Sequence, residues 1–134
     1  MAKQGDQPWK THNWFVSQWN YSDEVRKDFK FAKQIKIHDI TLRDGEQQTG
    51  IIMTKDDKIR IAEGLAEAGV HRIEAGMPVV SPSDNEAIKE IVKRNLGPQI
   101  FSFARCMKED VKRAIDTGVK GVVMEIPSSQ HIID

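Results

Sequence analysis

The chain has 134 residues, with 20 basic and 20 acidic side chains and no formal net charge. The balanced charge, without a long basic block, argues against a nucleic-acid partner. The longest apolar runs fall far short of the roughly 20 residues that cross a bilayer, the N-terminus lacks the apolar stretch of a secretory signal, and a single cysteine excludes an internal disulfide. These features are typical of a soluble cytoplasmic protein without a membrane partner.

Residues 1–34 differ in composition from the rest of the chain. They hold all three tryptophans and four further aromatic residues: Trp9, Trp14, Trp19, Phe15, Tyr21, Phe29 and Phe31. So aromatic an extension is expected to pack its rings on the outside of the following domain or on a second subunit. A lid or a substrate contact is the alternative.

Residues 35–134 alternate between short apolar runs and amphipathic stretches. The runs predict strands over residues 35–39, 72–75, 99–103 and 121–126. Each of the three gaps has the length and periodicity of a helix. Strands that alternate with such helices indicate parallel βα units.

Polar and glycine residues mark the ends of these helices. Thr54 and Asp57 have the spacing of a capping box at the start of the first helix, and Gly69 can end it. Ser83 and Glu86 have the same spacing at the start of the second helix, which is expected to end near Gly97. The expected inward-facing residues of the three helices are Ile59, Ala62, Leu65 and Ala66, then Ile88, Ile91 and Val92, then Val111, Ala114 and Ile115.

The most informative motif directly follows the first predicted strand. Residues 39–47 read Asp-Ile-Thr-Leu-Arg-Asp-Gly-Glu-Gln. Asp44 offers hard oxygen ligands, which suit Mg²⁺ or Mn²⁺, or Zn²⁺ in a mixed site with histidine. Arg43 carries a permanent charge that can hold a developing oxyanion. The alternatives are a turn-capping aspartate and an arginine in an ordinary salt bridge.

This run resembles the signature of the metal-dependent acyl-CoA:2-oxo acid synthases and lyases. The family includes 2-isopropylmalate, homocitrate and citramalate synthases and 3-hydroxy-3-methylglutaryl-CoA lyase. Residues 74–78 (Glu-Ala-Gly-Met-Pro) and 81–87 (Ser-Pro-Ser-Asp-Asn-Glu-Ala) resemble the synthase branch, with Met77 where phenylalanine is usual. The lyase branch tends to carry Thr-Ser-Phe instead.

The resemblance implies a (β/α)8 TIM barrel, of which residues 35–134 match the first four strands and three helices. A complete barrel takes about 250 residues, so we expect the chain to be part of a longer protein. Periodicity alone would also allow a flavodoxin-like open sheet.

The resemblance also implies roles for particular residues. Arg43 and Glu74 would be catalytic, with Arg43 as the partner that a carboxylate inside the barrel needs; a purely structural ion pair is the alternative. Asp44 would bind the metal. The implied substrate-binding residues are Arg43, Gln47, Arg105 and Ser129, with surface or loop positions as the alternative for the last three. The family completes its metal site with a His-x-His pair, which this sequence lacks.

The implied function is a metal-dependent Claisen condensation of acetyl-CoA with a 2-oxo acid in a homodimeric enzyme. A carbon–carbon lyase with a similar metal site is one alternative, and a non-catalytic half-barrel that works by binding or assembly is another. We expect Cys106 to be a small buried side chain and His131 to lie in a loop rather than to bind the metal.

Overall fold

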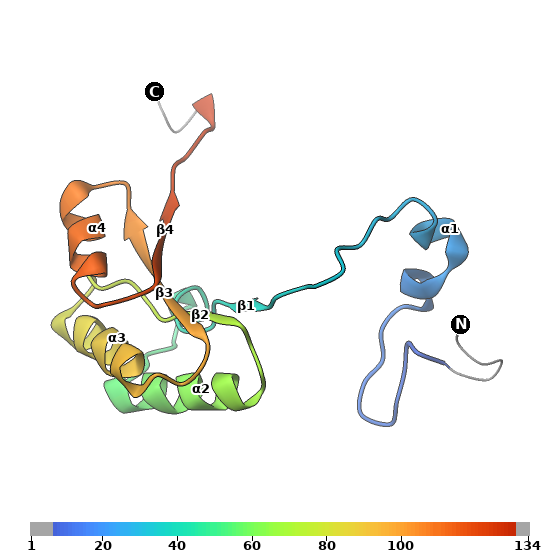
Figure 1. The fold of residues 1–134 in the computed structure, drawn as a ribbon, viewed down its shortest axis with the longest axis horizontal. Helices are drawn as coiled ribbons and strands as arrows, with labels where there is room; N and C mark the ends of the chain where they lie inside the picture. Colours follow the sequence, from blue (N-terminus) through green and yellow to red (C-terminus); the bar gives the residue numbers. More distant parts are fainter. Residues whose placement is uncertain (1–6, 131–134) are drawn as a thin grey trace. The chain divides into compact units, whose positions relative to one another are not determined.

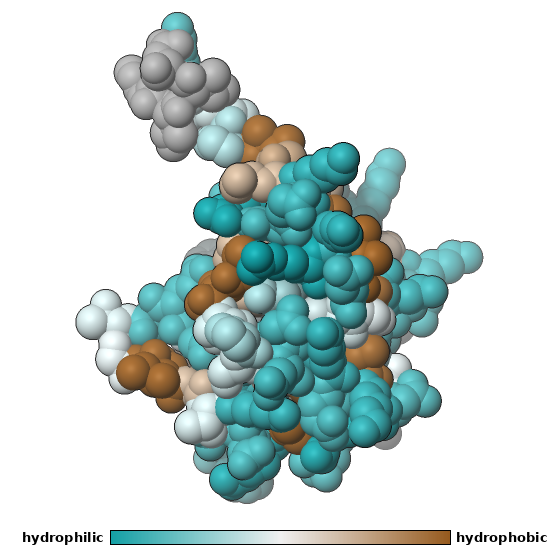
Figure 2. All heavy atoms as spheres, turned by 90° about the vertical axis from the view of Figure 1, so that its left-hand side faces the viewer, coloured by the Kyte–Doolittle hydropathy of each residue, from teal (hydrophilic) through white to brown (hydrophobic). Residues whose placement is uncertain are grey.

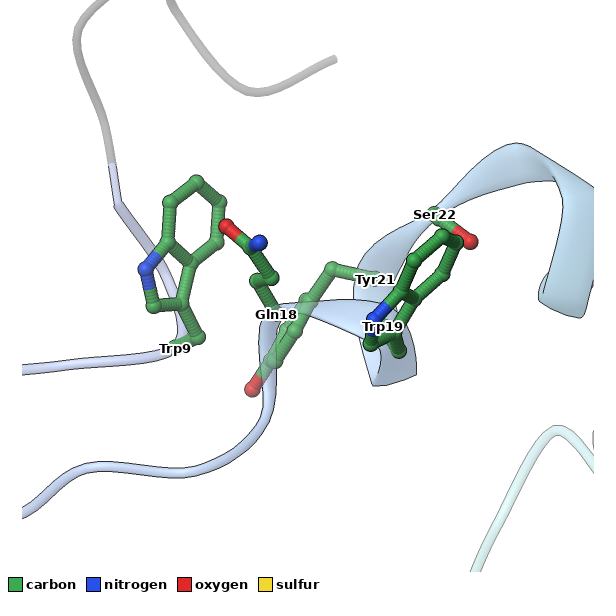
Figure 3. Close-up of a pocket in the computed structure, with 5 residues that line it drawn as sticks. All are labelled: Trp9, Gln18, Trp19, Tyr21 and Ser22. Atoms are coloured by element: carbon green, nitrogen blue, oxygen red, sulfur yellow. The ribbon is translucent and has the colours of Figure 1, made fainter.

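The computed structural model describes residues 7–130, which divide along the chain into two compact units, with the boundary between Ile35 and Lys36. The first unit contains a 3-10 turn at Gln18–Tyr21 and the short helix α1 (Asp23–Arg26) (Figure 1). Within it, five side chains line a hollow of about 260 Å³ (Figure 3): Trp9, Gln18, Trp19, Tyr21 and Ser22. This unit therefore has some packing of its own among its aromatic rings.

The second unit is a parallel sheet with a helix in each connection (Figure 1). Its strands are β1 (His38–Asp39), β2 (Arg72–Glu74), β3 (Gln99–Arg105) and β4 (Gly121–Glu125). The helices are α2 (Lys55–Glu67), α3 (Pro82–Arg94) and α4 (Lys108–Ile115). Each strand pairs with the next in the chain, in the order β1-β2-β3-β4. A flavodoxin-like sheet would place β1 between β2 and β3, so this order is that of the start of a TIM barrel, and the sheet is not closed.

The strands present two different faces. On β3, Ile100, Ser102 and Ala104 are buried, whereas Phe101 and Phe103 between them are only partly buried. The buried face packs toward the helices, where the core consists of Leu42, Ile59, Ala62, Ile73, Ala75, Ile88, Ile91 and Ile100. Burying each large aliphatic side chain contributes roughly 1.5–3 kcal/mol, so this layer holds the unit together. Phe101 and Phe103 face the side that is the interior of a barrel.

The outer surface of the helices is mostly polar. Figure 2 shows the α3 and α4 side as largely hydrophilic, with small apolar areas between the charged side chains. Within residues 7–130, no helix combines the length and apolar character that crossing a membrane would require.

Several boundaries differ from those predicted. Strand β1 covers only His38–Asp39, because the amides of His71 and Arg72 both donate to the Ile37 carbonyl while the Ile37 amide donates to the His71 ring, so regular pairing begins later. Helix α3 begins earlier than the Ser83–Glu86 spacing suggested. Ser81 is its N-cap and accepts from the Asp84 amide, with Pro82 in the first turn, where proline is favoured.

Two burial predictions were wrong. Ile115 is 62% exposed, because it is the last residue of the short helix α4 and lies beside, not on, the buried face that carries Ala114. Cys106 is exposed in the bend between β3 and α4 instead of being a small core residue. His131 lies outside the described residues.

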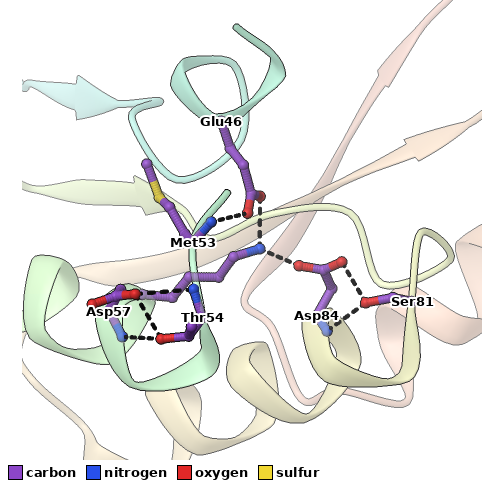
Figure 4. A network of polar contacts seen from close by, with 7 residues as sticks. Glu46, Met53, Thr54, Asp57, Ser81 and Asp84 are labelled. Carbon is purple, nitrogen blue, oxygen red and sulfur yellow. Dashed lines mark hydrogen bonds and ion pairs between the residues drawn. The ribbon is translucent and has the colours of Figure 1, made fainter. Parts of the chain in front are cut away.

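The capping box at the start of α2 is present as predicted. Thr54 Oγ1 accepts from the Asp57 amide, and Asp57 Oδ2 accepts from the Thr54 amide at 3.1 Å and from its hydroxyl at 2.6 Å (Figure 4). The hydroxyl hydrogen bond lowers the pKa of the Asp57 carboxyl. The box fixes where α2 begins, immediately after the loop that follows β1.

Replacing Thr54 by alanine should lower the free energy of unfolding by about 1 kcal/mol, the usual effect of losing an N-cap. Denaturant unfolding measures this change. Thr49→Ala, in the exposed loop before the cap, is the control and should change stability by less than about 0.5 kcal/mol. Equal effects of the two substitutions would contradict a role for the cap.

Candidate functional site

The loop after β1 places its charged side chains at the C-terminal end of the sheet. The amides of Arg43, Asp44 and Gly45 all point at the Ile40 carbonyl, at 2.8–3.3 Å, which makes a tight turn. A 3-10 turn at Gly45–Gln47 follows. Active sites of TIM barrels lie at this end of the strands, so this loop is in the position that a catalytic loop would occupy.

A buried ion pair joins this loop to β2. Arg43 Nε donates to Glu74 Oε1 at 2.5 Å, and the Glu74 residue is only 2% exposed. His38 Nε2 lies 3.2 Å from the other carboxylate oxygen. Both oxygens of Glu74 therefore have partners, which a buried carboxylate requires. The structure confirms that Arg43 is the partner of Glu74.

Aromatic rings enclose the pair on the same face of the sheet. The Arg43 guanidinium lies 5.0 Å from the centre of the Phe103 ring, and the His38 ring lies 5.5 Å from that of Phe101. A side chain at Gly121 would overlap the Phe101 ring, so glycine there leaves the space that this ring occupies. Apolar walls strengthen the electrostatic interactions of the charges between them.

Asp44 extends the cluster toward solvent. Its Oδ1 accepts from Arg43 Nη1 at 2.8 Å, and its side chain is 55% exposed. Within the described residues, no three His, Cys, Asp or Glu side chains gather closely enough to hold a metal ion. Asp44 thus fits as a single hard-oxygen ligand, and it does not form a complete metal site with its neighbours.

Gln47 shares a small cavity with Arg43. The cavity has a volume of about 180 Å³ and lies between the loop after β1 and the loop after β2. Its walls are Arg43, Glu46, Gln47, Gly76, Met77, Val80 and Asp84. A guanidinium and an amide facing one small cavity could bind a carbonyl or carboxylate group there.

Arg105 and Ser129 do not join this cluster in the part of the chain that the structure describes. Arg105 donates to both oxygens of Asp110, at 2.5 and 3.1 Å, and this hydrogen bonding lowers the pKa of the Asp110 carboxyl. Ser129 lies in the exposed segment after β4. Their roles in substrate binding, like those of Arg43 and Gln47, remain predictions, as does the role of Asp44 in metal binding.

Sequence reasoning missed two parts of the site. One is His38, whose contact with Glu74 follows from the parallel register in which His38 lies beside Arg72. Residues 38 and 74 then share one face of the sheet, but residue spacing along the sequence does not reveal the register. The other is Lys58, which contacts Glu46 and Asp84 from within α2. The sequence signal for Lys58 was a lysine at a position that the helical spacing of α2 assigns to the apolar face.

Comparisons with known proteins bear on the family and the fold. Residues 34–134 match the family described as HMGL-like. The chain is 46% identical to a probable 2-isopropylmalate synthase of Ignicoccus hospitalis and 48% identical to a putative (R)-citramalate synthase of Archaeoglobus fulgidus, over 72% and 74% of its length. It is 40% identical to a homocitrate synthase of Methanothermobacter thermautotrophicus over 87% of its length.

These alignments span 24%, 20% and 29% of the three relatives, so the chain corresponds to a quarter or so of their length. Among solved structures, HMG-CoA lyase of Bacillus subtilis superimposes with a TM-score of 0.61 at 21% identity, over 78% of this chain and 36% of that one. This likeness concerns the fold. Since the family match covers three quarters of the sequence, the chain belongs to the HMGL-like family.

Proposed function

We propose that this chain provides the first half of the catalytic barrel of a synthase that condenses acetyl-CoA with a 2-oxo acid. The observation that carries the proposal is the Arg43 guanidinium, which Glu74 and Asp44 hold at the mouth of the sheet beside a cavity shared with Gln47. Relatives at 40–48% identity are named as synthases of this type. Residues from the rest of such a barrel would complete the site.

The proposed reaction is a Claisen-type condensation followed by hydrolysis. The methyl group of acetyl-CoA loses a proton, the resulting enolate attacks the ketone carbon of the oxo acid, and water cleaves the thioester. The products are free CoA and a 2-hydroxy acid with one carboxylate more than the oxo acid. Negative charge develops on the ketone oxygen during the attack, so a fixed cation near that oxygen accelerates the reaction.

Three side chains of this chain would serve that chemistry. Arg43 would hold the oxygen on which charge develops, because its Nε and Nη1 are already fixed by carboxylates. Gln47 would donate its amide to the oxo acid across the cavity. Asp44 would be one ligand of a Mg²⁺, Mn²⁺ or Zn²⁺ ion. Such an ion, when bound, polarises a carbonyl group as a Lewis acid.

The same proposal includes two further substrate-binding residues and an oligomeric state. Arg105, the last residue of β3, and Ser129, after β4, would approach the oxo acid from the same end of the sheet. The enzyme would act as a homodimer. Exposed apolar side chains such as Ile52, which is 91% exposed, support contact with further protein surface.

The proposed function is tested with the full-length protein that contains this chain. We expect acetyl-CoA with one of pyruvate, 2-oxoisovalerate or 2-oxoglutarate to release free CoA thiol and to give a 2-hydroxy acid with one carboxylate more than the oxo acid, detectable by mass spectrometry. Chelation should abolish the activity, and Mg²⁺, Mn²⁺ or Zn²⁺ should restore it. Cleavage of 3-hydroxy-3-methylglutaryl-CoA without condensation would instead establish a lyase. No turnover of either kind would favour a binding or assembly role.

A further inference from the structure

Lys58 is a charged residue in a place that is unfavourable for it. It lies in the second turn of α2, is only 2% exposed, and has its ammonium group within the protein. Burying a cation costs free energy unless it is paired, and the positive end of a helix dipole adds to that cost. The lysine is therefore tolerated only because the carboxylates of Glu46 and Asp84 pair with its ammonium group.

The ammonium group connects two segments that are far apart in sequence, the loop after β1 and the start of α3 (Figure 4). Nζ donates to Glu46 Oε2, in the loop after β1, at 2.7 Å. It also donates to Asp84 Oδ1, in the first turn of α3. Glu46 and Asp84 thus share this nitrogen as their partner. Lys58 therefore acts as a bridge between the loop after β1 and the start of α3.

Both carboxylates of the bridge are themselves fixed from the opposite side. Glu46 Oε1 accepts from the Met53 amide at 3.4 Å, and Asp84 Oδ2 accepts from the Ser81 hydroxyl at 2.7 Å (Figure 4). The side chains of Glu46 and Asp84 are 25% and 14% exposed. The charges are thus largely shielded from solvent. A shielded ion pair has more effect on geometry than one at the surface.

The bridge also forms two walls of the candidate site. Glu46 and Asp84 line the same cavity of about 180 Å³ as Arg43 and Gln47. Glu46 is flanked in the chain by Gly45 and Gln47 within one 3-10 turn. Holding Glu46 in place therefore limits the movement of the segment that carries Arg43, Asp44 and Gln47.

We propose that Lys58 is a positioning residue: it fixes the loop carrying Arg43 to Gln47 against the start of α3, and thereby sets the geometry of the cavity between them. The consequence for catalysis rests on the proposed function, whereas the fixing of the loop does not. A shift of about 1 Å in a catalytic group can lower a rate about 100-fold, so losing the bridge should act on kcat.

The test uses the full-length protein and separates positioning from folding. Lys58→Met alone leaves two carboxylates without their cation and can unfold the protein. The neutral triple variant Lys58→Met, Glu46→Gln and Asp84→Asn removes the bridge without leaving a buried charge. Lys58→Arg keeps the charge and tests rescue. Lys55→Met is the matched control, because Lys55 lies on the same helix in an exposed 3.5 Å pair with Glu86.

Hydrogen exchange gives a readout that does not depend on activity. In the neutral triple variant, the amides of residues 43–53 should exchange at least tenfold faster than in the wild type, while those of β3 and α4 stay unchanged. Lys55→Met should leave residues 43–53 unchanged. Unchanged exchange of these residues in the triple variant would overturn the proposal, whatever the protein catalyses.

Steady-state kinetics gives the second readout. With the condensation assay, kcat of the triple variant should fall tenfold to a hundredfold, Lys58→Arg should recover a large part of it, and Lys55→Met should stay within twofold of the wild type. Unchanged kcat in the triple variant would overturn the catalytic consequence. If the wild type itself catalyses no condensation, the proposed function fails, and the exchange data alone decide whether Lys58 fixes the loop.

Discussion

Replacing Arg43 by lysine should lower kcat of the full-length enzyme by about 10²–10³, the usual loss when one fixed oxyanion-stabilising group is removed. Lysine keeps the charge, so Glu74 retains a cation nearby. It cannot donate to Glu74 and Asp44 at once from a planar fork, as Arg43 does. The ammonium would therefore lack a fixed position beside the cavity. Steady-state rates of CoA release, with thermal melts of the same samples, measure the effect.

The matched control is Arg94→Lys. Arg94 also contacts two acidic side chains, Glu63 and Glu90, but it lies on the outer helices away from the cavity. Its replacement should leave kcat within twofold of the wild type. If Arg43→Lys has near-normal kcat, Arg43 serves only to neutralise Glu74, and the catalytic assignment is wrong.

Replacing Asp44 by asparagine should weaken binding of the divalent metal at least tenfold, the effect seen for altered metal surroundings. The substitution keeps the shape and one oxygen, but removes the negative charge that attracts the ion. The turn should persist, because the Asp44 amide bonds to Ile40 through the backbone. Isothermal titration with Mn²⁺ or Zn²⁺ on the full-length protein gives the dissociation constants.

Asp56→Asn is the control for metal binding. Asp56 is in the first turn of α2 and faces solvent, so its loss should change helix stability slightly and metal affinity not at all. Equal metal affinity in Asp44→Asn and the wild type would remove Asp44 from the metal site.

The elements of the sheet and helices could be read from the sequence because their patterns are local. The capping box at Thr54 and the apolar spacing of α2 depend only on neighbours in the chain. The errors arose where a tertiary contact or a competing cap decided the outcome. Ser81 with Pro82 displaced the expected start at Ser83, and the strand at residues 35–39 was shortened by hydrogen bonds to His71.

The candidate site was predictable only in part, for a related reason. Glu74 had to have a cation, and Arg43 was the nearest one on the expected mouth of the barrel, so chemistry alone identified that pair. The contacts of His38 with Glu74 and of Lys58 with Glu46 and Asp84 depend on strand register and on how α2 and α3 pack. Neither can be read from residue spacing along one helix or strand.

The pairing of each strand with its successor has a consequence for how the site is made. His38, Arg43 and Glu74 are separated by at most 36 positions along the chain, so the loop that their contacts close is short. Short loops lose little entropy on closing and form early in folding. On the ribosome, where N-terminal segments are released first, the Arg43–Glu74 pair can assemble as soon as β2 and β3 have emerged. Under the proposed function, the charged centre would then serve as a template on which the rest of such a barrel docks.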